Sequence, residues 1–443
     1  MRIDHVTIRN YRGFEERTFD FGQNAQNSDG SFHVLIGENG SGKSTALDAL
    51  AVALGIWHVA SPAAGWRSIK AEDARLILKK VGDQTRFDPT PSPGVSVTGR
   101  IDNQTLRWTR ENKEYSSKTV NTGAKEALEA INSLLDRSLK ENGVMLPVLA
   151  YYGAGRAWLA GRDRKVSVNL ELKKTSRFDA YYHSLDGQIR HQAINRWFLF
   201  ERVETLNNGE KRSSLRAVEE AVLSCLPGAT RLRFDGDRKE IVLGIGDEEI
   251  PFYSLSDGQR SMVAMVADIA IKAVTLNPHL GECAAKKSTG VVLIDELDLH
   301  LHPKWQRIVV ECLRNAFPCL QFVGTTHSPF IVQTLREGEL IALDAQSIPE
   351  TSNVGIEDIA KGLMGVERPD VSPRYMTMKQ VAKDYLVALE EADKTPNERL
   401  EDFEVALAKD IAPFADNPAF QAFLELKREG KIGNRRNGNS KTG

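Results

Sequence analysis

The sequence predicts an α/β fold that carries a phosphate-binding loop, with a long insertion in its middle and helices at its C-terminal end. Two observations predict this fold. A glycine-rich loop at residues 37–44 lies between an apolar strand pattern and an Ala- and Leu-rich helix pattern. Far along the chain, a second apolar strand pattern at residues 291–294 ends in two adjacent carboxylates, at the position where parallel sheets bind ligands.

The loop fits the pattern G-x-x-x-x-G-K-[ST], and it has the strand and helix context that a phosphate-binding loop requires. The glycines let successive backbone N–H groups converge on phosphate oxygens, and the helix start adds partial positive charge. Lys43 can reach the β- and γ-phosphates, and the Ser44 hydroxyl can bind Mg²⁺. We therefore predict ATP and Mg²⁺ as ligands, with nucleotide contacts from Gly37, Glu38, Asn39, Gly40, Ser41, Gly42, Lys43, Ser44 and Thr45. The alternative, a glycine-rich turn that binds nothing, does not explain the flanking pattern.

The two carboxylates after residue 294 are Asp295 and Glu296. An apolar, β-branched run before them is typical of a central parallel strand that is buried on both faces. Two adjacent acids at its end can divide the chemistry. Asp295 can hold Mg²⁺, often through water, and Glu296 can polarise the attacking water. We predict Asp295 as a metal ligand together with Ser44, and Glu296 as the catalytic base.

Three further segments follow the motif order of ABC-type ATPases. Residues 255–260 (Leu-Ser-Asp-Gly-Gln-Arg) resemble the signature motif, residues 325–329 (Thr-Thr-His-Ser-Pro) resemble the switch-histidine loop, and residues 297–303 lie where a D-loop is expected. The resemblance implies a head-to-tail homodimer with two ATPs, in which the signature of one subunit contacts the nucleotide of the other. The signature residues concerned are Ser256, Asp257, Gly258 and Gln259. The resemblance also implies that His327 senses the γ-phosphate and acts in catalysis with Lys43 and Glu296.

Other interpretations of these motifs stay open at this stage. His300 and His302 could chelate a metal as a His-x-His pair, although no further Cys or His lies nearby at a metal-like spacing. His327 could be a core histidine. A second signature-like segment at residues 184–188 lies far from the acid pair and precedes a polar and aromatic helix pattern, so we regard it as a chance match.

Within this superfamily, the chain resembles the RecF/SMC/OLD-like branch. Residues 8–14 resemble the opening strand and turn of that branch, which implies that Arg12 contacts the nucleotide, and residues 295–303 resemble its acid pair and D-loop. By these motifs, the chain is similar in function to the ATPase subunit (PtuA) of Septu-type anti-phage systems, which works with a separate HNH nuclease. The resemblance thus implies a defence ATPase with an HNH-type partner nuclease. The alternative is a RecF-like DNA-repair clamp that binds DNA as an ATP-dependent dimer.

One segment departs from the superfamily pattern. A Q-loop glutamine is expected after a strand in the first half, but the strand pattern at residues 148–152 is followed by Gly-Ala-Gly and Arg156. Coordination of metal and water by a glutamine side chain is therefore in doubt. Backbone atoms or Arg156 could take its place.

The motif positions predict how the chain is divided. We expect residues 1–60 and 251–345, with the strand near 145–156, to form the ATPase core, and residues 61–250 to form an insertion or lid. No heptad pattern is sustained in the insertion, which predicts a compact lid rather than a long coiled coil. Residues 346–443 are expected to form a helical segment with a disordered tail.

The C-terminal segment shows no catalytic pattern. Amphipathic helices are expected over residues 377–394, 397–411 and 418–429, and the tail begins at residue 430. No acidic cluster like that of a Toprim nuclease and no His-Asn-His pattern appears, so we predict no nuclease site in this chain. The helices could dock a partner protein, or they could simply pack on the core.

The charge composition of the chain limits how it could bind nucleic acid. The net charge of −2 over 443 residues gives no global attraction to nucleic acid, but residues 150–240 hold 17 Lys and Arg against 12 Asp and Glu. DNA binding by this segment is therefore possible, and a solvated lid surface is the alternative. The basic and aromatic candidates are Arg162, Arg164, Lys165, Lys173, Lys174, Arg231, Arg233, Arg238, Lys239, Tyr181, Tyr182 and Trp197.

The remaining features predict a cytoplasmic protein without a membrane segment. No apolar run approaches about 18 residues, which is the length needed to span a bilayer. The N-terminus begins directly with a strand pattern, so no signal peptide is expected. The four cysteines show no metal-like spacing and are typical of reduced thiols.

Overall fold

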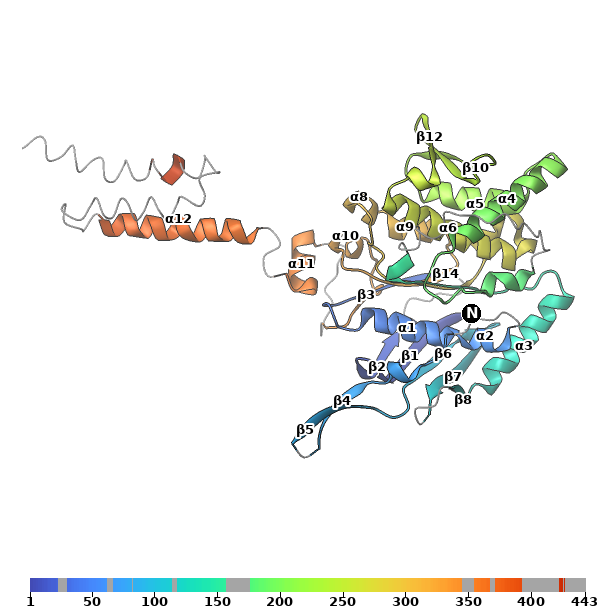
Figure 1. Ribbon diagram of the computed structural model, residues 1–443, viewed down its shortest axis with the longest axis horizontal. Helices are drawn as coiled ribbons and strands as arrows, with labels where there is room; N and C mark the ends of the chain where they lie inside the picture. The colour runs from blue at the N-terminus through green and yellow to red at the C-terminus, as the bar shows by residue number, and fades with distance from the viewer. Residues whose placement is uncertain are drawn as a thin grey trace, which may run out of the picture. The chain divides into compact units, whose positions relative to one another are not determined.

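The computed structural model describes residues 1–22, 30–61, 67–81, 83–113, 118–156, 176–344, 354–366, 371–392, 422–424 and 426 (Figure 1). The chain divides into two compact units, residues 1–365 and 366–443. The first unit contains all of the motifs described above.

A five-stranded parallel sheet forms the centre of the first unit, with the order β15-β3-β14-β13-β9. Its members are β3 (Ser31–Ile36), β9 (Val148–Tyr152), β13 (Gly290–Ile294), β14 (Leu320–Thr325) and β15 (Leu340–Ala342). Every residue of β9, β13 and β14 is buried, which explains why these strands are continuous apolar runs rather than alternating ones. Strand β9 corresponds to the strand expected near residue 150, and it pairs with β13 at the edge of this sheet.

A second sheet is antiparallel and has the order β2-β1-β6-β7-β8. Its members are β1 (Arg2–Tyr11), β2 (Phe14–Asp20), β6 (Gly94–Ile101), β7 (Gln104–Asn112) and β8 (Thr119–Thr122). Strand β1 pairs with β2 on one side and with β6 on the other. The expected boundary at residue 60 therefore runs through one sheet, because strands from the insertion complete the sheet that the N-terminus begins.

Helix α1 (Lys43–Leu54) lies between the two sheets and contacts β1 and β6 on one side and β13 and β14 on the other (Figure 1). Every residue from Ala46 to Leu54 is buried, and four of these nine are alanines, which let both sheets approach closely. The sheets are also joined directly. The buried side chain of Gln321 on β14 accepts from the Ile3 N–H at 2.8 Å and donates to the Ile3 carbonyl at 2.7 Å.

Helices pack around the parallel sheet and beside the antiparallel one (Figure 1). They are α2 (Ile56–Ala60), α3 (Lys125–Lys140), η3 (Arg177–Tyr181), α4 (His191–Asn208), α5 (Ser213–Ser224), η4 (Phe252–Ser254), α6 (Asp257–Leu276), η5 (Pro278–Cys283), α7 (Ala284–Lys287), α8 (Pro303–Gln306), α9 (Val309–Ala316), α10 (Pro329–Val332) and α11 (Ile356–Met364). A small antiparallel sheet of β10 (Ala229–Asp235), β11 (Glu240–Ile245) and β12 (Glu248–Pro251) packs beside α4 and α5. The described part of the insertion contains no long coiled coil, as predicted.

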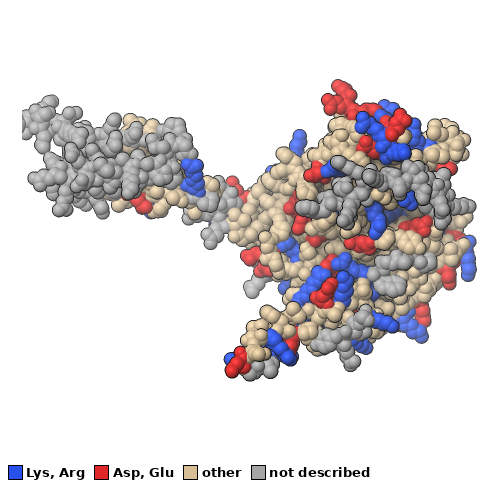
Figure 2. Space-filling model, viewed as in Figure 1, with Lys and Arg blue, Asp and Glu red and all other residues tan. Residues whose placement is uncertain are grey.

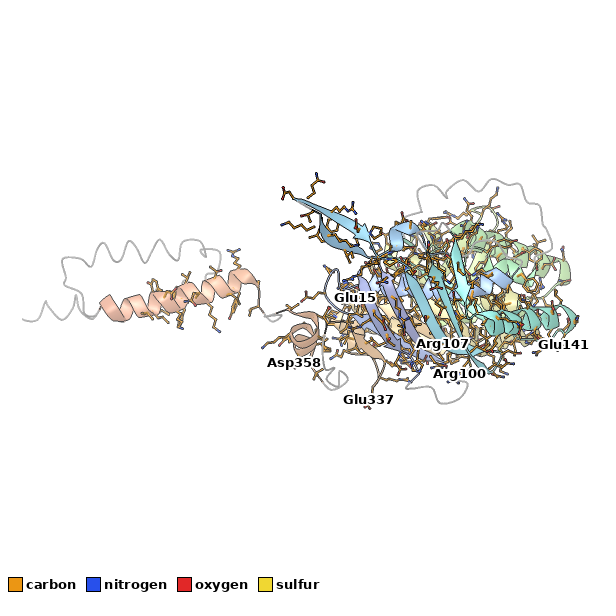
Figure 3. All side chains as sticks on the ribbon, turned by 90° about the horizontal axis from the view of Figure 1, so that it is seen from below. Glu15, Arg100, Arg107, Glu141, Glu337 and Asp358 are labelled. Carbon is orange, nitrogen blue, oxygen red and sulfur yellow. The ribbon has the colours of Figure 1, made fainter. Side chains whose placement is uncertain are left out.

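A two-stranded hairpin of β4 (Leu76–Val81) and β5 (Gln84–Pro89) projects from the body of the first unit (Figure 3). It follows η1 (Ala71–Asp73). Leu78 and Phe87 are opposite each other in the register, and with Leu76 they form an exposed apolar stripe.

The second unit contains helix α12 (Pro373–Ala392), which is the helix expected over residues 377–394. Its Tyr385 side chain is buried. The helix expected over residues 397–411 and the tail from residue 430 lie outside the described residues. Of residues 418–429, only 422–424 and 426 are described, and these are helical. Among the described helices, none combines the length and apolar character that crossing a membrane requires.

Candidate functional site

The phosphate-binding loop connects β3 to α1, as its motif predicts. Gly42 has a φ of 101°, and a Cβ atom there would lie 2.6 Å from the ring of Phe14, so the position needs glycine for both conformation and space. The Lys43 ammonium donates to the carbonyls of Gly37 at 2.7 Å and Glu38 at 2.8 Å. These bonds hold the ammonium against the loop itself. Burial lowers the pKa of Lys43, while neighbouring carboxylates, Asp344 first among them, oppose this effect.

Asp344, just after β15, was not singled out by the sequence motifs. Its carboxylate accepts from the Glu38 N–H at 2.7 Å. It therefore fixes the first turn of the loop from the neighbouring strand. No local pattern marks this aspartate, because β15 becomes the neighbour of β3 only in the folded sheet.

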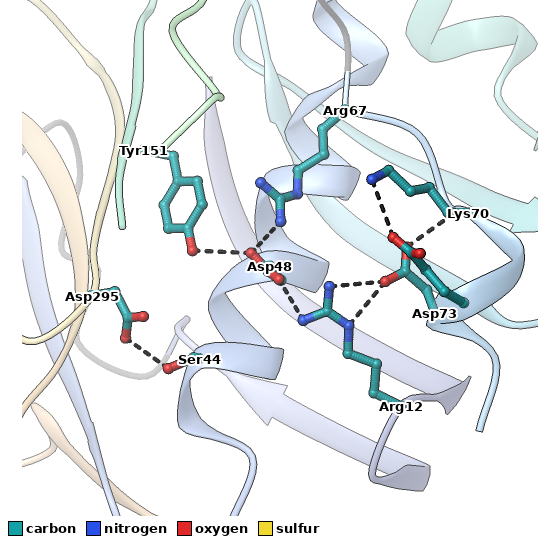
Figure 4. A network of polar contacts seen from close by, with 9 residues as sticks. Arg12, Ser44, Asp48, Arg67, Lys70, Asp73, Tyr151 and Asp295 are labelled. Carbon is teal, nitrogen blue, oxygen red and sulfur yellow. Dashed lines mark hydrogen bonds and ion pairs between the residues drawn. The ribbon is translucent and has the colours of Figure 1, made fainter. Parts of the chain in front are cut away.

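Ser44 and Asp295 are brought together although 251 residues separate them. The Ser44 hydroxyl donates to Asp295 Oδ1 at 3.1 Å (Figure 4). The Thr325 hydroxyl donates to the same oxygen at 2.6 Å. The three side chains meet because β3, β14 and β13 are parallel neighbours whose carboxyl ends share one edge of the sheet. A serine hydroxyl beside a carboxylate is the hard oxygen donor set that Mg²⁺ prefers, so these residues fit the metal that the motif implies.

Glu296 has an unusual backbone conformation, with a φ of 50°. Its N–H donates to the Thr325 hydroxyl at 2.8 Å. Its carbonyl accepts from the Arg156 guanidinium at 2.7 Å, and the same guanidinium donates to the carbonyl of Asp295. A left-handed conformation at a non-glycine residue costs on the order of 1–3 kcal/mol and persists only when its surroundings hold it. Thr325 and Arg156 supply that restraint from two sides.

Arg156 is 2 % exposed and follows β9, at the place where the Q-loop glutamine is expected. Burial lowers its pKa to about 10, so the guanidinium stays charged at neutral pH. Its contacts go to the backbone of the acid pair. Arg156 therefore positions the acids, which is a role that the motif comparison could not have assigned.

A buried carboxylate, Asp48, lies on α1 one turn after Ser44 (Figure 4). It accepts from Arg12 at 2.6 Å and from the Tyr151 hydroxyl at 3.0 Å, and it also pairs with Arg67. Burial and the Asp48 charge raise the pKa of Tyr151, which keeps the phenol protonated as a donor. This network joins the turn after β1, the helix after the loop and the end of β9.

Arg12, a predicted nucleotide contact, is thus held by two carboxylates. Besides Asp48, its Nε donates to Asp73 at 2.9 Å. It adopts a φ of 47°, and its N–H donates to the Asp73 carbonyl at 2.7 Å. The Arg12 side chain is 38 % exposed, so it stays accessible from solvent.

The signature segment forms the start of α6. Ser256 is the N-cap, with its hydroxyl accepting from the Gln259 N–H while the Gln259 side chain accepts from the Ser256 N–H. A Cβ atom at Gly258 would lie 2.4 Å from the His300 carbonyl, so glycine lets the D-loop pack directly on this turn. Asp257 pairs with Arg260. Ser256 and Asp257 are exposed and point away from the buried body of α6.

The D-loop also orders the switch loop. Asp298 accepts from the Thr326 hydroxyl at 2.6 Å and from the His327 N–H at 3.2 Å, and His327 itself is exposed. The ring of His302 caps α8 by accepting from the Lys304 N–H at 3.2 Å. The described residues contain no group of three His, Cys, Asp or Glu side chains that could hold a metal.

Several candidate DNA-binding arginines form ion pairs with acidic residues, which the sequence could not show. Arg231 and Arg233 pair with Glu249, and Arg238 pairs with Glu240, so the acids of the small sheet compensate its arginines. Figure 2 shows this mixture of basic and acidic side chains over β10 and β12. Tyr181 is buried. Five of the basic candidates lie outside the described residues: Arg162, Arg164, Lys165, Lys173 and Lys174.

Comparisons with known proteins agree with the geometry of the loop and acid pair. The family described as "AAA domain" matches residues 5–226, which is half of the chain, and a second AAA-domain family matches residues 172–333. The chain is 26% identical to "Retron Vc95 probable ATPase" of Vibrio cholerae serotype O1 biovar El Tor, over 77% of this chain and 73% of that protein. It is 26% identical to "Septu protein PtuA" of Bacillus mycoides (strain KBAB4), over 77% of this chain but 40% of that protein.

A solved structure titled "Crystal structure of the SmcHead bound to the C-winged helix domain of ScpA" is similar with a TM-score of 0.47 and 16% identity, over 77% of this chain and 94% of that one. The family assignment rests on the domain matches and on the loop and acid pair. The chain is an ATP-hydrolysing enzyme and belongs to the AAA domain family.

Proposed function

We propose that the protein binds ATP with Mg²⁺ at the edge of the parallel sheet and hydrolyses it there. The observation that carries this proposal is the meeting of Ser44, Asp295 and Glu296 beside the glycine-rich loop. Lys43 and the loop N–H groups would bind the phosphates. Ser44 and Asp295 would hold Mg²⁺, which supplies positive charge against the developing charge on the phosphates.

Glu296 is the group that would accept a proton from the attacking water or orient it. The Arg156 and Thr325 contacts fix the backbone of Glu296, so its side chain starts from a defined position. Catalysis of phosphoryl transfer depends mainly on positioning and electrostatics, and such a fixed base fits that requirement. His327, ordered through Asp298, would contact the γ-phosphate.

A second copy of the chain would complete the site. The exposed residues Ser256 and Asp257 stand at the start of a 20-residue helix, where a signature motif would meet the nucleotide of a partner. The Ser256 cap leaves the first turn of α6 ordered before any partner arrives. ATP would then hold two subunits together, and hydrolysis would release them.

In cellular terms, we assign this ATPase to anti-phage defence, as the sensor or regulator of a partner nuclease of the HNH type. The retron ATPase and Septu PtuA relatives support the assignment. The helices expected over residues 376–430 are the proposed docking platform, because they follow the last motif of the nucleotide site and carry no catalytic pattern of their own.

The test is co-purification of the full chain with the product of a neighbouring HNH gene, beside a chain truncated after Gln346. We expect both chains to bind ATP and only the full chain to retain the nuclease. A truncated chain that keeps the nuclease would move the docking surface to the insertion. A truncated chain that is insoluble or cannot bind ATP would instead make these helices part of the core.

One observation favours a second candidate, a DNA clamp that needs no nuclease. The chain is 25% identical over 187 residues to "DNA double-strand break repair Rad50 ATPase" of Pyrococcus abyssi (strain GE5 / Orsay), over 42% of this chain and 19% of that protein. ATP-dependent, salt-sensitive binding of the chain alone to gapped duplex DNA would support the clamp. If the chain does not bind gapped duplex DNA in this measurement, regulation of a partner nuclease is the better assignment.

A further inference from the structure

A cavity lies apart from the phosphate-binding loop, among η3, α4 and the C-terminal half of α6. Its volume is about 580 Å³, within the range of roughly 300–1,000 Å³ that small-molecule sites occupy. None of the loop or acid-pair residues lines it. The nucleotide site described above therefore does not account for this cavity.

The charges in the cavity wall favour an anion. Basic side chains outnumber carboxylates there by five to three. Arg177 donates to the carbonyls of Leu276, Val144 and Ser138, at 2.8, 2.7 and 3.3 Å, and has no carboxylate partner among the described residues. These neutral acceptors fix the guanidinium without cancelling its charge. Arg196 on α4 is exposed and forms no hydrogen bond or ion pair with a described residue.

The same wall offers aromatic surface. Trp197 and Phe200 are three residues apart on α4, so they lie on one face of the helix, and both line the cavity. The Arg212 guanidinium lies over the Phe200 ring at 5.9 Å from its centroid. Aromatic rings beside arginines are the surface on which nucleobases stack.

A buried acceptor completes the set. Glu201 is 3 % exposed and lines the cavity. Its Oε1 accepts from the Ser214 hydroxyl at 3.1 Å and forms an ion pair with Arg212 at 3.5 Å, while its Oε2 has no hydrogen-bond partner among the described residues. A buried oxygen without a donor is costly, and the amino or imino N–H of a base would satisfy it after a small side-chain shift.

We propose that this cavity is a second nucleotide site, which takes a free mononucleotide. Trp197 and Phe200 would stack the base, Arg177 and Arg196 would bind the phosphate, and Glu201 would accept from the base.

The cavity is connected to the hydrolytic site by a short chain of hydrogen bonds. Asp268 on α6 lines the cavity with Lys272, with which it pairs, and it accepts from the Tyr152 hydroxyl at 2.7 Å. The carbonyl of Tyr152, at the end of β9, accepts from the Asp295 N–H at 2.7 Å. A ligand that moves Lys272 or Asp268 would thus act on the strand end that carries the metal-binding carboxylate. The site would therefore change the ATPase rate as well as bind nucleotide.

The binding test uses the full chain with Lys43→Ala, so that the phosphate-binding loop contributes no signal. AMP, GMP, CMP and UMP are titrated by calorimetry, with inorganic phosphate and the four nucleosides as separate arms. We expect one site per chain for at least one mononucleotide, with phosphate and the nucleoside each at least tenfold weaker. No binding of any mononucleotide at millimolar concentration would overturn the proposal. So would binding of a ten-residue oligothymidylate without binding of the mononucleotides, because that indicates a nucleic-acid surface.

Matched variants on α4 locate the ligand. Arg196→Glu in the cavity wall should weaken binding tenfold or more. Arg202→Glu makes the same charge change on the same helix outside the cavity, and it should change the affinity less than twofold. Equal losses in the two variants would mean general electrostatic attraction rather than a site.

The regulatory link is tested separately in the chain with an intact loop. The mononucleotide that binds should change the rate of phosphate release, and Tyr152→Phe should remove that change while the affinity for the mononucleotide is kept. A regulatory effect that persists in Tyr152→Phe would refute the link through Asp268. Because binding is measured without hydrolysis, its outcome is independent of the proposed ATPase mechanism.

Discussion

Arg156→Lys tests whether the acid pair depends on a guanidinium behind it. In the native chain two nitrogens of Arg156 reach two carbonyls, those of Asp295 and Glu296. An ammonium is a compact point charge and lacks the planar fork of a guanidinium. The substitution keeps the positive charge and breaks at least one of the two hydrogen bonds.

The magnitude follows from these contacts. A hydrogen bond to a charged group contributes about 1.5–3 kcal/mol, and the left-handed conformation of Glu296 opposes it by a similar amount. Losing one bond lets the Glu296 backbone relax toward an unstrained conformation. If the energy of the lost hydrogen bond is lost from the stabilisation of the transition state, kcat should drop by about 10- to 150-fold. The conversion is that about 1.36 kcal/mol corresponds to a factor of ten. The KM for ATP should stay within about threefold, because the hydrogen bonds of Arg156 go to the carbonyls of Gly153, Asp295 and Glu296 and not to the phosphate-binding loop.

The assay is steady-state phosphate release across ATP concentrations, with the thermal unfolding midpoint measured beside it. Arg202→Lys is the control, since Arg202 is exposed and forms no ion pair with a described residue. A kcat within twofold of the native value, in a chain with native thermal stability, would refute the idea that Arg156 positions the acids.

Four further substitutions test the other parts of the site and the fold. Lys43→Ala should abolish ATP binding in a fluorescent-nucleotide titration, and native affinity would remove the loop assignment. Glu296→Gln should keep ATP binding, lower turnover by about 100-fold or more and accumulate a dimer in gel filtration with ATP, whereas native turnover would mean another base. Ser256→Arg should block hydrolysis but spare ATP binding, and a monomer that no longer binds ATP would contradict a signature acting on the partner's nucleotide. Gln321→Leu should lower the free energy of unfolding in denaturant by roughly 2–6 kcal/mol, because it leaves both polar groups of Ile3 buried and unpaired; a loss below about 0.5 kcal/mol would contradict this.

The sequence could predict the parts of the site that depend on short segments. The loop at residues 37–44 and the acid-ended strand at 291–294 each carry their own pattern, and parallel-sheet geometry brings their ends together. Such segments need no knowledge of distant partners. For that reason the core fold and the nature of the enzyme were predictable.

Other parts depend on pairings between distant segments, which no local pattern records. The alternating strand at residues 94–101 could have belonged to a separate lid, and only its pairing with β1 places it in the N-terminal sheet. Asp48 has the appearance of one polar residue in an apolar helix, yet it joins side chains from three segments. The sequence likewise shows an arginine at position 156 but not the carbonyls that it reaches.

The order of strands in the parallel sheet has a consequence for synthesis. Strand β3 leads into the phosphate-binding loop, and both of its neighbours, β14 and β15, come from residues 320–342. A ribosome adding about 5–20 residues per second needs roughly 15–60 s to travel from β3 to these strands. Throughout that interval, β3 exposes two unpaired edges of an apolar strand. The nascent chain therefore carries an unpaired apolar strand for this period, and ATP binding can begin only when most of the chain has been made.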